Sequence, residues 1–184
     1  VSDSIPVTVP ISSRKIISFV LLSSSDVVAV DTKGIVIEID TKNLAERVVG
    51  NLKHENISDA VLSPSGNSVV YSFYNAENSK TSSYLNFKNG ESFDITGEVR
   101  SAAFSPDGGQ FAYLTTNKDG GELLVSKGIN TTERVLKTRI DVAVVSWQSN
   151  ISLISYGKDG YGDLFVVKDN TLNKIVSSKY GLNV

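Results

Sequence analysis

The chain has 184 residues, with 18 basic and 20 acidic side chains and a formal net charge of -2. This length can bury a substantial core, and 40% hydrophobic residues is too much for a disordered chain. The absence of cysteine excludes disulfides and cysteine-based sites, and the single histidine excludes a multi-histidine metal site. The charges are scattered, with Arg14-Lys15 the longest basic run, so no nucleic-acid patch is indicated. No apolar run approaches the roughly 20 residues of a membrane helix, so direct membrane insertion is not expected.

The chain repeats itself four times. Ten-residue windows align without a gap, and they begin at Leu21, Leu62, Phe104 and Trp147. These residues lie 41, 42 and 43 positions apart, a period typical of β-propeller blades. We assign residues 1–12 to an extended N-terminal segment and the blades to residues 13–184, approximately 13–53, 54–96, 97–139 and 140–179.

Each unit is predicted to contain four strands. The innermost strand is an apolar run that ends at the window's first residue, namely 16–21, 57–62, 99–104 and 142–147. A turn follows, clearest in Ser63-Pro64-Ser65-Gly66 and Ser105-Pro106-Asp107-Gly108, where proline presets φ and glycine tolerates a positive φ. Second strands end near Val30, Tyr74, Thr115 and Tyr156. Third strands are expected at 35–39, 83–87, 122–125 and 164–167, and weaker fourth strands at 45–49, 92–95, 134–136 and 174–176.

One segment has a competing helical interpretation. Leu44, Val48 and Leu52 have helical spacing, but Gly50 and the β-branched pair Val48-Val49 favour a strand. No segment has a convincing helical pattern longer than two turns. The predicted fold class is therefore all-β, a β-propeller built of four-stranded antiparallel blades.

Two stretches resemble the WD-like repeat of TolB-type propellers. They are Ala103-Phe-Ser-Pro-Asp-Gly108 with Phe111-Ala-Tyr-Leu-Thr115 and Asn117 to Val125, and Lys158-Asp-Gly-Tyr-Gly-Asp-Leu-Phe-Val-Val167. Leu62 to Gly66 is a weaker copy, and the first unit has neither the proline nor the glycine. The resemblance covers about residues 16–176. It implies a propeller fold and says little about function, because one fold serves many functions.

The resemblance implies two roles. Such propellers often act as non-catalytic protein-binding scaffolds outside the cytoplasm, which makes a protein partner and an extracytoplasmic location the first expectation. They also form the gating module of prolyl-oligopeptidase-type enzymes, which is the alternative. The chain has no Gly-x-Ser-x-Gly nucleophile elbow, and we identify no catalytic centre, cofactor site or metal site in it. A calcium-dependent or carbohydrate-binding module is a third and weaker hypothesis.

The number of blades stays open at this stage. Four blades can close into a small ring, or they can be part of a larger propeller. An open array leaves apolar blade faces and unpaired edges, which favours a homodimer through those faces.

Few residues suggest a site. Asp119, Glu122, Asp159 and Asp163 supply oxygen ligands of the kind calcium prefers, but turn chemistry explains them better. His54, with Glu55 and Asp59 nearby, is better interpreted as part of a loop between blades.

The tyrosines are the remaining candidates. Tyr71, Tyr113 and Tyr156 occupy the same window position and are expected to pack between blades. Tyr74, Tyr84 and Tyr161 lie near predicted loops and are therefore the candidates for an exposed partner-binding surface.

Overall fold

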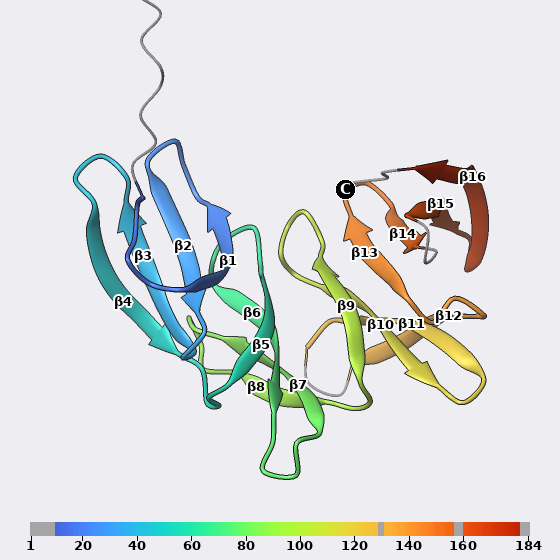
Figure 1. Ribbon diagram of the computed structural model, residues 1–184, viewed down its shortest axis with the longest axis horizontal. Helices are drawn as coiled ribbons and strands as arrows, with labels where there is room; N and C mark the ends of the chain where they lie inside the picture. The colour runs from blue at the N-terminus through green and yellow to red at the C-terminus, as the bar shows by residue number, and fades with distance from the viewer. Residues whose placement is uncertain (1–9, 129–130, 157–159, 181–184) are drawn as a thin grey trace, which may run out of the picture.

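The computed structural model describes residues 10–128, 131–156 and 160–180. In these ranges all regular elements are β-strands, and no helix long and apolar enough to cross a membrane is present. The strands form four antiparallel sheets of four strands each, and within a sheet they follow one another in chain order (Figure 1). The predicted all-β fold of four-stranded antiparallel blades is therefore confirmed.

The strands lie close to the predicted ranges. They are β1 (Ile16–Leu21), β2 (Asp26–Asp31), β3 (Ile35–Asp40) and β4 (Ala45–Asn51) in sheet 1; β5 (Ile57–Leu62), β6 (Ser68–Tyr74), β7 (Lys80–Asn86) and β8 (Ser92–Ile95) in sheet 2; β9 (Val99–Phe104), β10 (Phe111–Asn117), β11 (Gly120–Ser126) and β12 (Thr132–Thr138) in sheet 3; and β13 (Ala143–Trp147), β14 (Ile151–Tyr156), β15 (Tyr161–Lys168) and β16 (Thr171–Tyr180) in sheet 4. The helical alternative for residues 43–52 is excluded, because β4 pairs with β3 over this segment and Leu44 has a φ of 59°.

The four sheets stand side by side in an arc. Their innermost strands contact one another in the order β1, β5, β9 and β13, with sheet 1 at one end of the arc and sheet 4 at the other (Figure 1). The end sheets carry exposed apolar side chains on their outer faces, since Phe19 is 65% exposed and Val144 is 40% exposed. The arc is open, and the closed four-bladed ring is not formed.

Separate apolar cores fill the spaces between neighbouring sheets. The core between sheets 1 and 2 is mostly aliphatic, and the core between sheets 3 and 4 is rich in leucine. The core between sheets 2 and 3 is aromatic, with Tyr84, Phe104, Phe111 and Tyr113 among its buried members. Each fully buried side chain of this size contributes about 1.5–3 kcal/mol through the hydrophobic effect. These cores, rather than a single central one, hold each sheet to its neighbours.

The two Ser-Pro-x-Gly turns form as predicted. The Gly66 amide donates to the Ser63 carbonyl at 2.8 Å, and the Gly108 amide donates to the Ser105 carbonyl at 2.8 Å. Both glycines have a positive φ, 69° and 71°. In the second turn Ser105 Oγ also donates to Asp107 Oδ1 at 2.6 Å, and this bond lowers the pKa of Asp107. Turn geometry thus accounts for the residues that carry the WD-like resemblance.

The gapless alignment of the four windows is wrong in two blades, and hairpin length explains why. In blades 2 and 3 the first residue of the window pairs with the eighth, Leu62 with Val69 and Phe104 with Phe111. In blade 1 Leu21 pairs with Val27, and in blade 4 Trp147 pairs with Ile151. Those turns are shorter by one and three residues, and an odd shift moves each following side chain to the opposite face of the sheet.

Tyr156 therefore does not share a position with Tyr71 and Tyr113. Tyr71 and Tyr113 are buried between sheets, with 1% and 4% of their surface exposed, as expected for packing residues. Tyr156 is 40% exposed and lies in the row of sheet 4 that faces away from sheet 3. The expectation that all three tyrosines pack between blades holds for two of them.

Candidate functional site

The structure does not bring the three candidate tyrosines together. Tyr74 ends β6 in sheet 2 and Tyr161 begins β15 in sheet 4, and each is 47% exposed. Tyr84 is a correction, because it is only 9% exposed. It lies within β7 and faces sheet 3, where its ring stacks on Phe93 at 5.0 Å and on Phe111 at 5.4 Å between centroids. No shared exposed tyrosine surface exists among these residues.

Two of the four carboxylates considered for calcium, those of Asp163 and Glu122, have other partners. Asp163 accepts hydrogen bonds from Lys174 Nζ at 2.7 Å and from the Ser178 amide at 2.8 Å, and these bonds lower its pKa. Glu122 lies 3.3 Å from Lys137 Nζ. Asp159 falls outside the described residues. In the described part of the chain no three acidic or histidine side chains form a group that could hold a metal ion.

His54 belongs to a polar cluster that the sequence did not reveal. Its Nδ1 lies 3.0 Å from the Tyr71 hydroxyl, and its ring stacks on Phe73 with centroids 3.7 Å apart. On neighbouring strands Ser83 donates to Asp94 at 2.5 Å. The hydrogen-bond partner of His54 is thus the Tyr71 hydroxyl and not the carboxylate of Glu55 or Asp59. Ser83 and Asp94 face each other across β7 and β8, a pairing that depends on strand register and that no motif marks.

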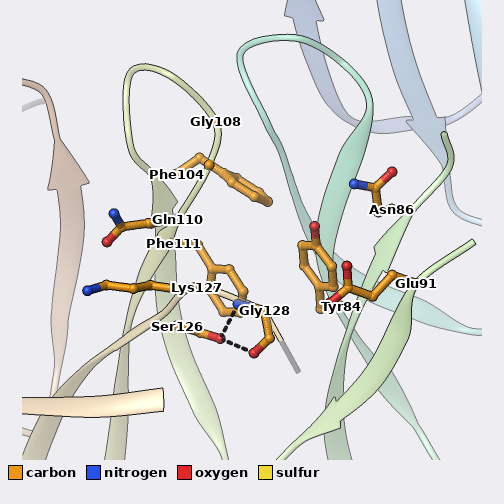
Figure 2. Close-up of a pocket in the computed structure, with 11 residues that line it drawn as sticks. Tyr84, Asn86, Glu91, Phe104, Gly108, Gln110, Phe111, Ser126, Lys127 and Gly128 are labelled. Atoms are coloured by element: carbon orange, nitrogen blue, oxygen red, sulfur yellow. Dashed lines mark hydrogen bonds between the residues drawn. The ribbon is translucent and has the colours of Figure 1, made fainter. Parts of the chain in front are cut away.

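A groove lies between sheets 2 and 3 and is lined by described residues of both sheets. Its first hollow has a volume of about 180 Å³ and lies beside the β9–β10 turn. Its lining is aromatic, with Tyr84, Phe104 and Phe111, and it includes Glu91 beside Tyr84, whereas the Gln110 and Lys127 side chains end away from the Tyr84 ring (Figure 2). An apolar lining with a few polar groups is the usual composition of a binding site.

The second hollow lies at the other end of the same strands. Its volume is about 460 Å³, and it is lined by Phe93, Asp94, Ile95, Thr96, Tyr113, Thr115, Glu122, Leu124 and Thr132. The Tyr84, Phe93 and Phe111 rings stand between the two hollows, with centroids 5.0 to 6.4 Å apart. We call the two hollows and these rings the interblade groove.

The short fourth strand of sheet 2 helps to open this groove. β8 has four residues, whereas β4 and β12 have seven and β16 has ten. A short outer strand covers less of the neighbouring sheet, and this leaves the hollow that Phe93 and Ile95 line together with Leu124, although Phe111 and Tyr113 stay buried. The sequence predicted the short range 92–95 for this strand but gave no sign that a groove would follow.

Charged side chains line both hollows, with Glu91 and Lys127 at the first and Asp94 and the Lys137-paired Glu122 at the second. At the first hollow, Ser126 Oγ donates to the Gly128 carbonyl at 3.2 Å and shapes the rim beside Lys127 (Figure 2). At the second hollow the side chains of Asp94 and Glu122 bring negative charge. Burial raises the pKa of Tyr113 there, so its hydroxyl stays protonated. The groove can therefore offer hydrogen-bond donors and acceptors beside an apolar lining.

Comparison with known proteins supports the fold. No family model and no curated protein matches the chain. Solved structures do match: a TolB protein from Agrobacterium tumefaciens aligns with a TM-score of 0.63 at 14% identity, over 92% of this chain and 65% of that one. The β-propeller domain of the trilobed protease from Pyrococcus furiosus aligns with a TM-score of 0.59 at 14% identity, over 90% and 57%. The fold is that of a TolB-like β-propeller.

TolB from Acinetobacter baumannii matches in the same way, with a TM-score of 0.59 at 14% identity, over 89% of this chain and 44% of that one. The chain thus spans between 44% and 65% of these three solved chains. At this level of identity the likeness concerns the fold. A TolB-like propeller module is established, and its binding site has to be argued from its own residues.

Proposed function

We propose that this TolB-like propeller is a non-catalytic module that binds an extended segment of a partner protein in the interblade groove. The observation that carries the proposal is the pair of hollows between sheets 2 and 3, which lie on either side of the packed rings of Tyr84, Phe93 and Phe111. An extended peptide places alternate side chains on one side, so apolar residues can enter the two hollows. Its backbone can bond to the polar rim.

A few well-packed aromatic residues contribute most of the binding free energy in many protein interfaces. The rings between the two hollows are held by two sheets, so little side-chain freedom is lost when a ligand binds. Glu91 and Lys127 at one end and Asp94 at the other would contact polar groups of the segment.

The test uses a random-peptide phage library selected on the immobilised chain. An enriched peptide is then titrated into the ¹⁵N-labelled protein, and amide shifts are followed by NMR. The proposal expects saturable shifts at Gly108, Lys127 and Thr115, which border the two hollows. It is overturned if no peptide is enriched, or if the shifts cluster on another sheet.

A matched set of variants tests whether the peptide binds in the groove or at the exposed tyrosines. Phe93→Ala removes a partly buried ring from the groove and should weaken the peptide about tenfold or more, in line with loss of an interface hot spot. Tyr74→Ala and Tyr161→Ala each remove a ring that is 47% exposed and lies outside the groove, so they should leave the affinity for the peptide unchanged. The opposite pattern would assign binding to the tyrosines predicted from the sequence.

A second candidate role is the gating module of a peptidase. The observation that favours it is the structural likeness to the propeller domain of the trilobed protease. The discriminating experiment is to sequence the gene on both sides of this segment and to assay its full product on fluorogenic peptides. Hydrolysis that is lost when the catalytic nucleophile of an adjoining domain is replaced would decide for the gating role.

We also propose that the module works outside the cytoplasm, on the strength of the repeat's resemblance to TolB-type propellers. Fusing alkaline phosphatase to the full gene product tests this location, because the enzyme is active only after export in a bacterial host. An inactive fusion, with a cytoplasmic reporter active at the same position, would contradict the proposal.

A further inference from the structure

The two ends of the arc present complementary kinds of sheet face. Where two neighbouring sheets pack inside the chain, the earlier sheet buries the face that it turns toward the next sheet. The later sheet buries the face that it turns toward the preceding sheet. Sheet 1 has no preceding sheet and sheet 4 has no following sheet in the described ranges (Figure 1). The described residues therefore present one unpaired face of each kind.

We call the outer face of sheet 1 the leading face. Strand register places its side chains in two rows across the sheet: Phe19, Ala29, Ile37 and Val48 in one, and Leu21, Val27, Ile39 and Glu46 in the other. Its central residues are buried at 0–2% exposure, whereas Phe19 and Leu21 on the innermost strand are both 65% exposed.

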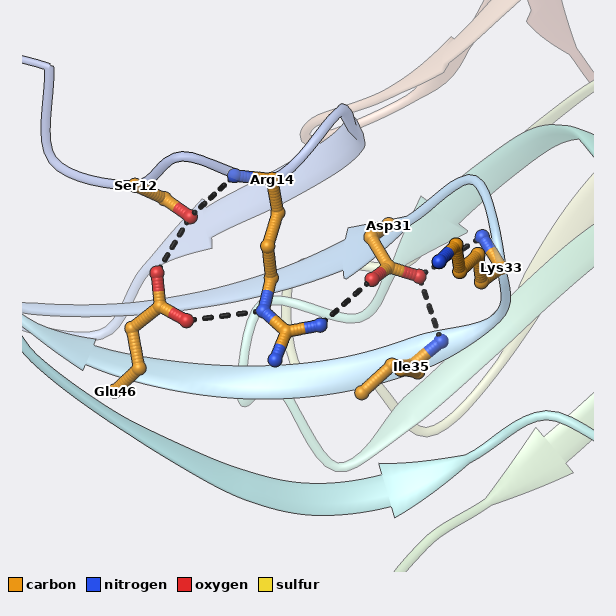
Figure 3. A network of polar contacts seen from close by, with 6 residues as sticks. All are labelled: Ser12, Arg14, Asp31, Lys33, Ile35 and Glu46. Carbon is orange, nitrogen blue, oxygen red and sulfur yellow. Dashed lines mark hydrogen bonds and ion pairs between the residues drawn. The ribbon is translucent and has the colours of Figure 1, made fainter.

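The N-terminal segment already covers the outer part of the leading face. Arg14 Nε donates to Glu46 Oε2 at 2.9 Å, and its NH1 donates to Asp31 Oδ2 at 3.0 Å, so the side chain spans β3 between β4 and β2 (Figure 3). Ser12 Oγ donates to the same Glu46 at 2.6 Å. The uncovered part of the face is thus the stripe along β1.

We call the outer face of sheet 4 the trailing face. One row consists of Val144, Ile154, Leu164 and Val176, and the next of Ser146, Ser152, Val166 and Asn173. Neither row contains a charged side chain. Val144 is 40% exposed and Val142, two residues earlier, is 58% exposed, so the uncovered stripe again follows the innermost strand.

We propose that the leading face of one chain packs on the trailing face of a second copy of the same chain, head to tail. The contact continues a series that the chain makes internally three times, in which β1 contacts β5, β5 contacts β9 and β9 contacts β13. The occupant is a second copy because one chain supplies both halves of this repeated interface. The trailing rows are uncharged, so pairing would remove apolar surface from water without burying an unpaired charge.

This contact is heterologous, because the two faces that meet are different. A pair of chains joined once still has one free face of each kind, so association proceeds to larger species unless the ring closes. A self-complementary patch would instead stop at the dimer. The two cases are distinguishable in solution.

The experiment is sedimentation velocity over a concentration series. The intact chain should show a mass that rises above 19.8 kDa with concentration. Phe19→Glu, on the leading face, and Val144→Glu, on the trailing face, should each be monomeric alone. Their mixture should form a defined heterodimer, because Phe19→Glu keeps its trailing face and Val144→Glu keeps its leading face. Tyr74→Glu, at a similarly exposed aromatic away from both faces, is the matched control and should associate like the intact chain.

A monomer of 19.8 kDa at all concentrations would overturn the proposal. So would a mixture that stays monomeric, or a Phe19→Glu variant that associates normally. Circular dichroism confirms that each variant keeps its sheet content. If either variant loses it, Leu21→Lys and Val142→Lys replace the pair, since these positions are 65% and 58% exposed. The result of this experiment does not depend on peptide binding in the interblade groove. Peptide binding can be measured separately on the same samples.

Discussion

Phe111 is the residue whose removal should damage the interface of sheets 2 and 3 most. It begins β10, is 2% exposed, and its ring lies among four others. The centroid distances are 5.4 Å to Tyr84, 5.5 Å to Tyr113, 5.7 Å to Phe104 and 6.4 Å to Phe93. Because the ring contacts both sheets, its side chain holds two blades together.

Phe111→Ala leaves a cavity that rigid neighbouring strands cannot fill. Replacing a buried phenylalanine by alanine costs about 3–5 kcal/mol. The value should lie at the upper end, since several aromatic pairs, each contributing about 0.5–1.5 kcal/mol beyond area, are lost at once. Against a total stability of about 5–15 kcal/mol for a typical domain, this is a large fraction.

The assay is urea unfolding at equilibrium, followed by far-ultraviolet circular dichroism and by Trp147 fluorescence. Phe111→Leu keeps most of the volume and should cost about 1–2 kcal/mol, which separates cavity formation from loss of aromaticity. Tyr74→Ala, at an exposed position, should change the free energy of unfolding by less than about 0.5 kcal/mol. A loss below about 1 kcal/mol for Phe111→Ala would refute the aromatic interface.

Three further perturbations test other parts of the structure. Gly121→Ala should destabilise the protein strongly, because the added Cβ would collide with the Ile140 carbonyl oxygen; a thermal melt equal to that of the intact chain would contradict this packing. The pKa of Asp163 is lowered by its bond to Lys174, so its ionisation stabilises the folded state above the unfolded pKa of about 3.9, and this contribution is lost as the pH falls through the folded-state pKa. Asp163→Asn should accordingly flatten the acid limb of the urea midpoint measured against pH; an unchanged limb would exclude the contribution. Arg14→Gln should release the N-terminal segment from the outer face of sheet 1 and speed its removal by proteinase K, which cleaves after aliphatic residues, whereas an unaltered digestion rate would show that the Arg14 bonds do not hold it.

The repeat made most of the fold predictable from the sequence. The spacing of Leu21, Leu62, Phe104 and Trp147 placed four strands in every unit, because turn residues recur at fixed distances from each. What it could not supply was the exact length of each hairpin. The first and fourth turns lack the Ser-Pro-x-Gly residues that fix the length of the other two. The shorter fourth turn places Tyr156 on the opposite face of its sheet.

The candidate site was much less predictable. Tyr84 was expected near an exposed loop because the predicted third strand began only at Ser83, but β7 starts at Lys80 and carries Tyr84 into the core. The groove depends on how two sheets stack and on the shortness of β8, neither of which leaves a local pattern. Its lining residues look like ordinary core positions in the sequence, since alternating aromatics serve packing and binding equally well.

The most direct test of the central claim is the measurement of intermolecular nuclear Overhauser effects between a selected peptide and the aromatic rings of the chain. If the groove between sheets 2 and 3 is the binding site, peptide protons should show contacts to the rings of Phe93 and Tyr113. Contacts to Tyr74 or Tyr161 instead, with none to the groove rings, would contradict it.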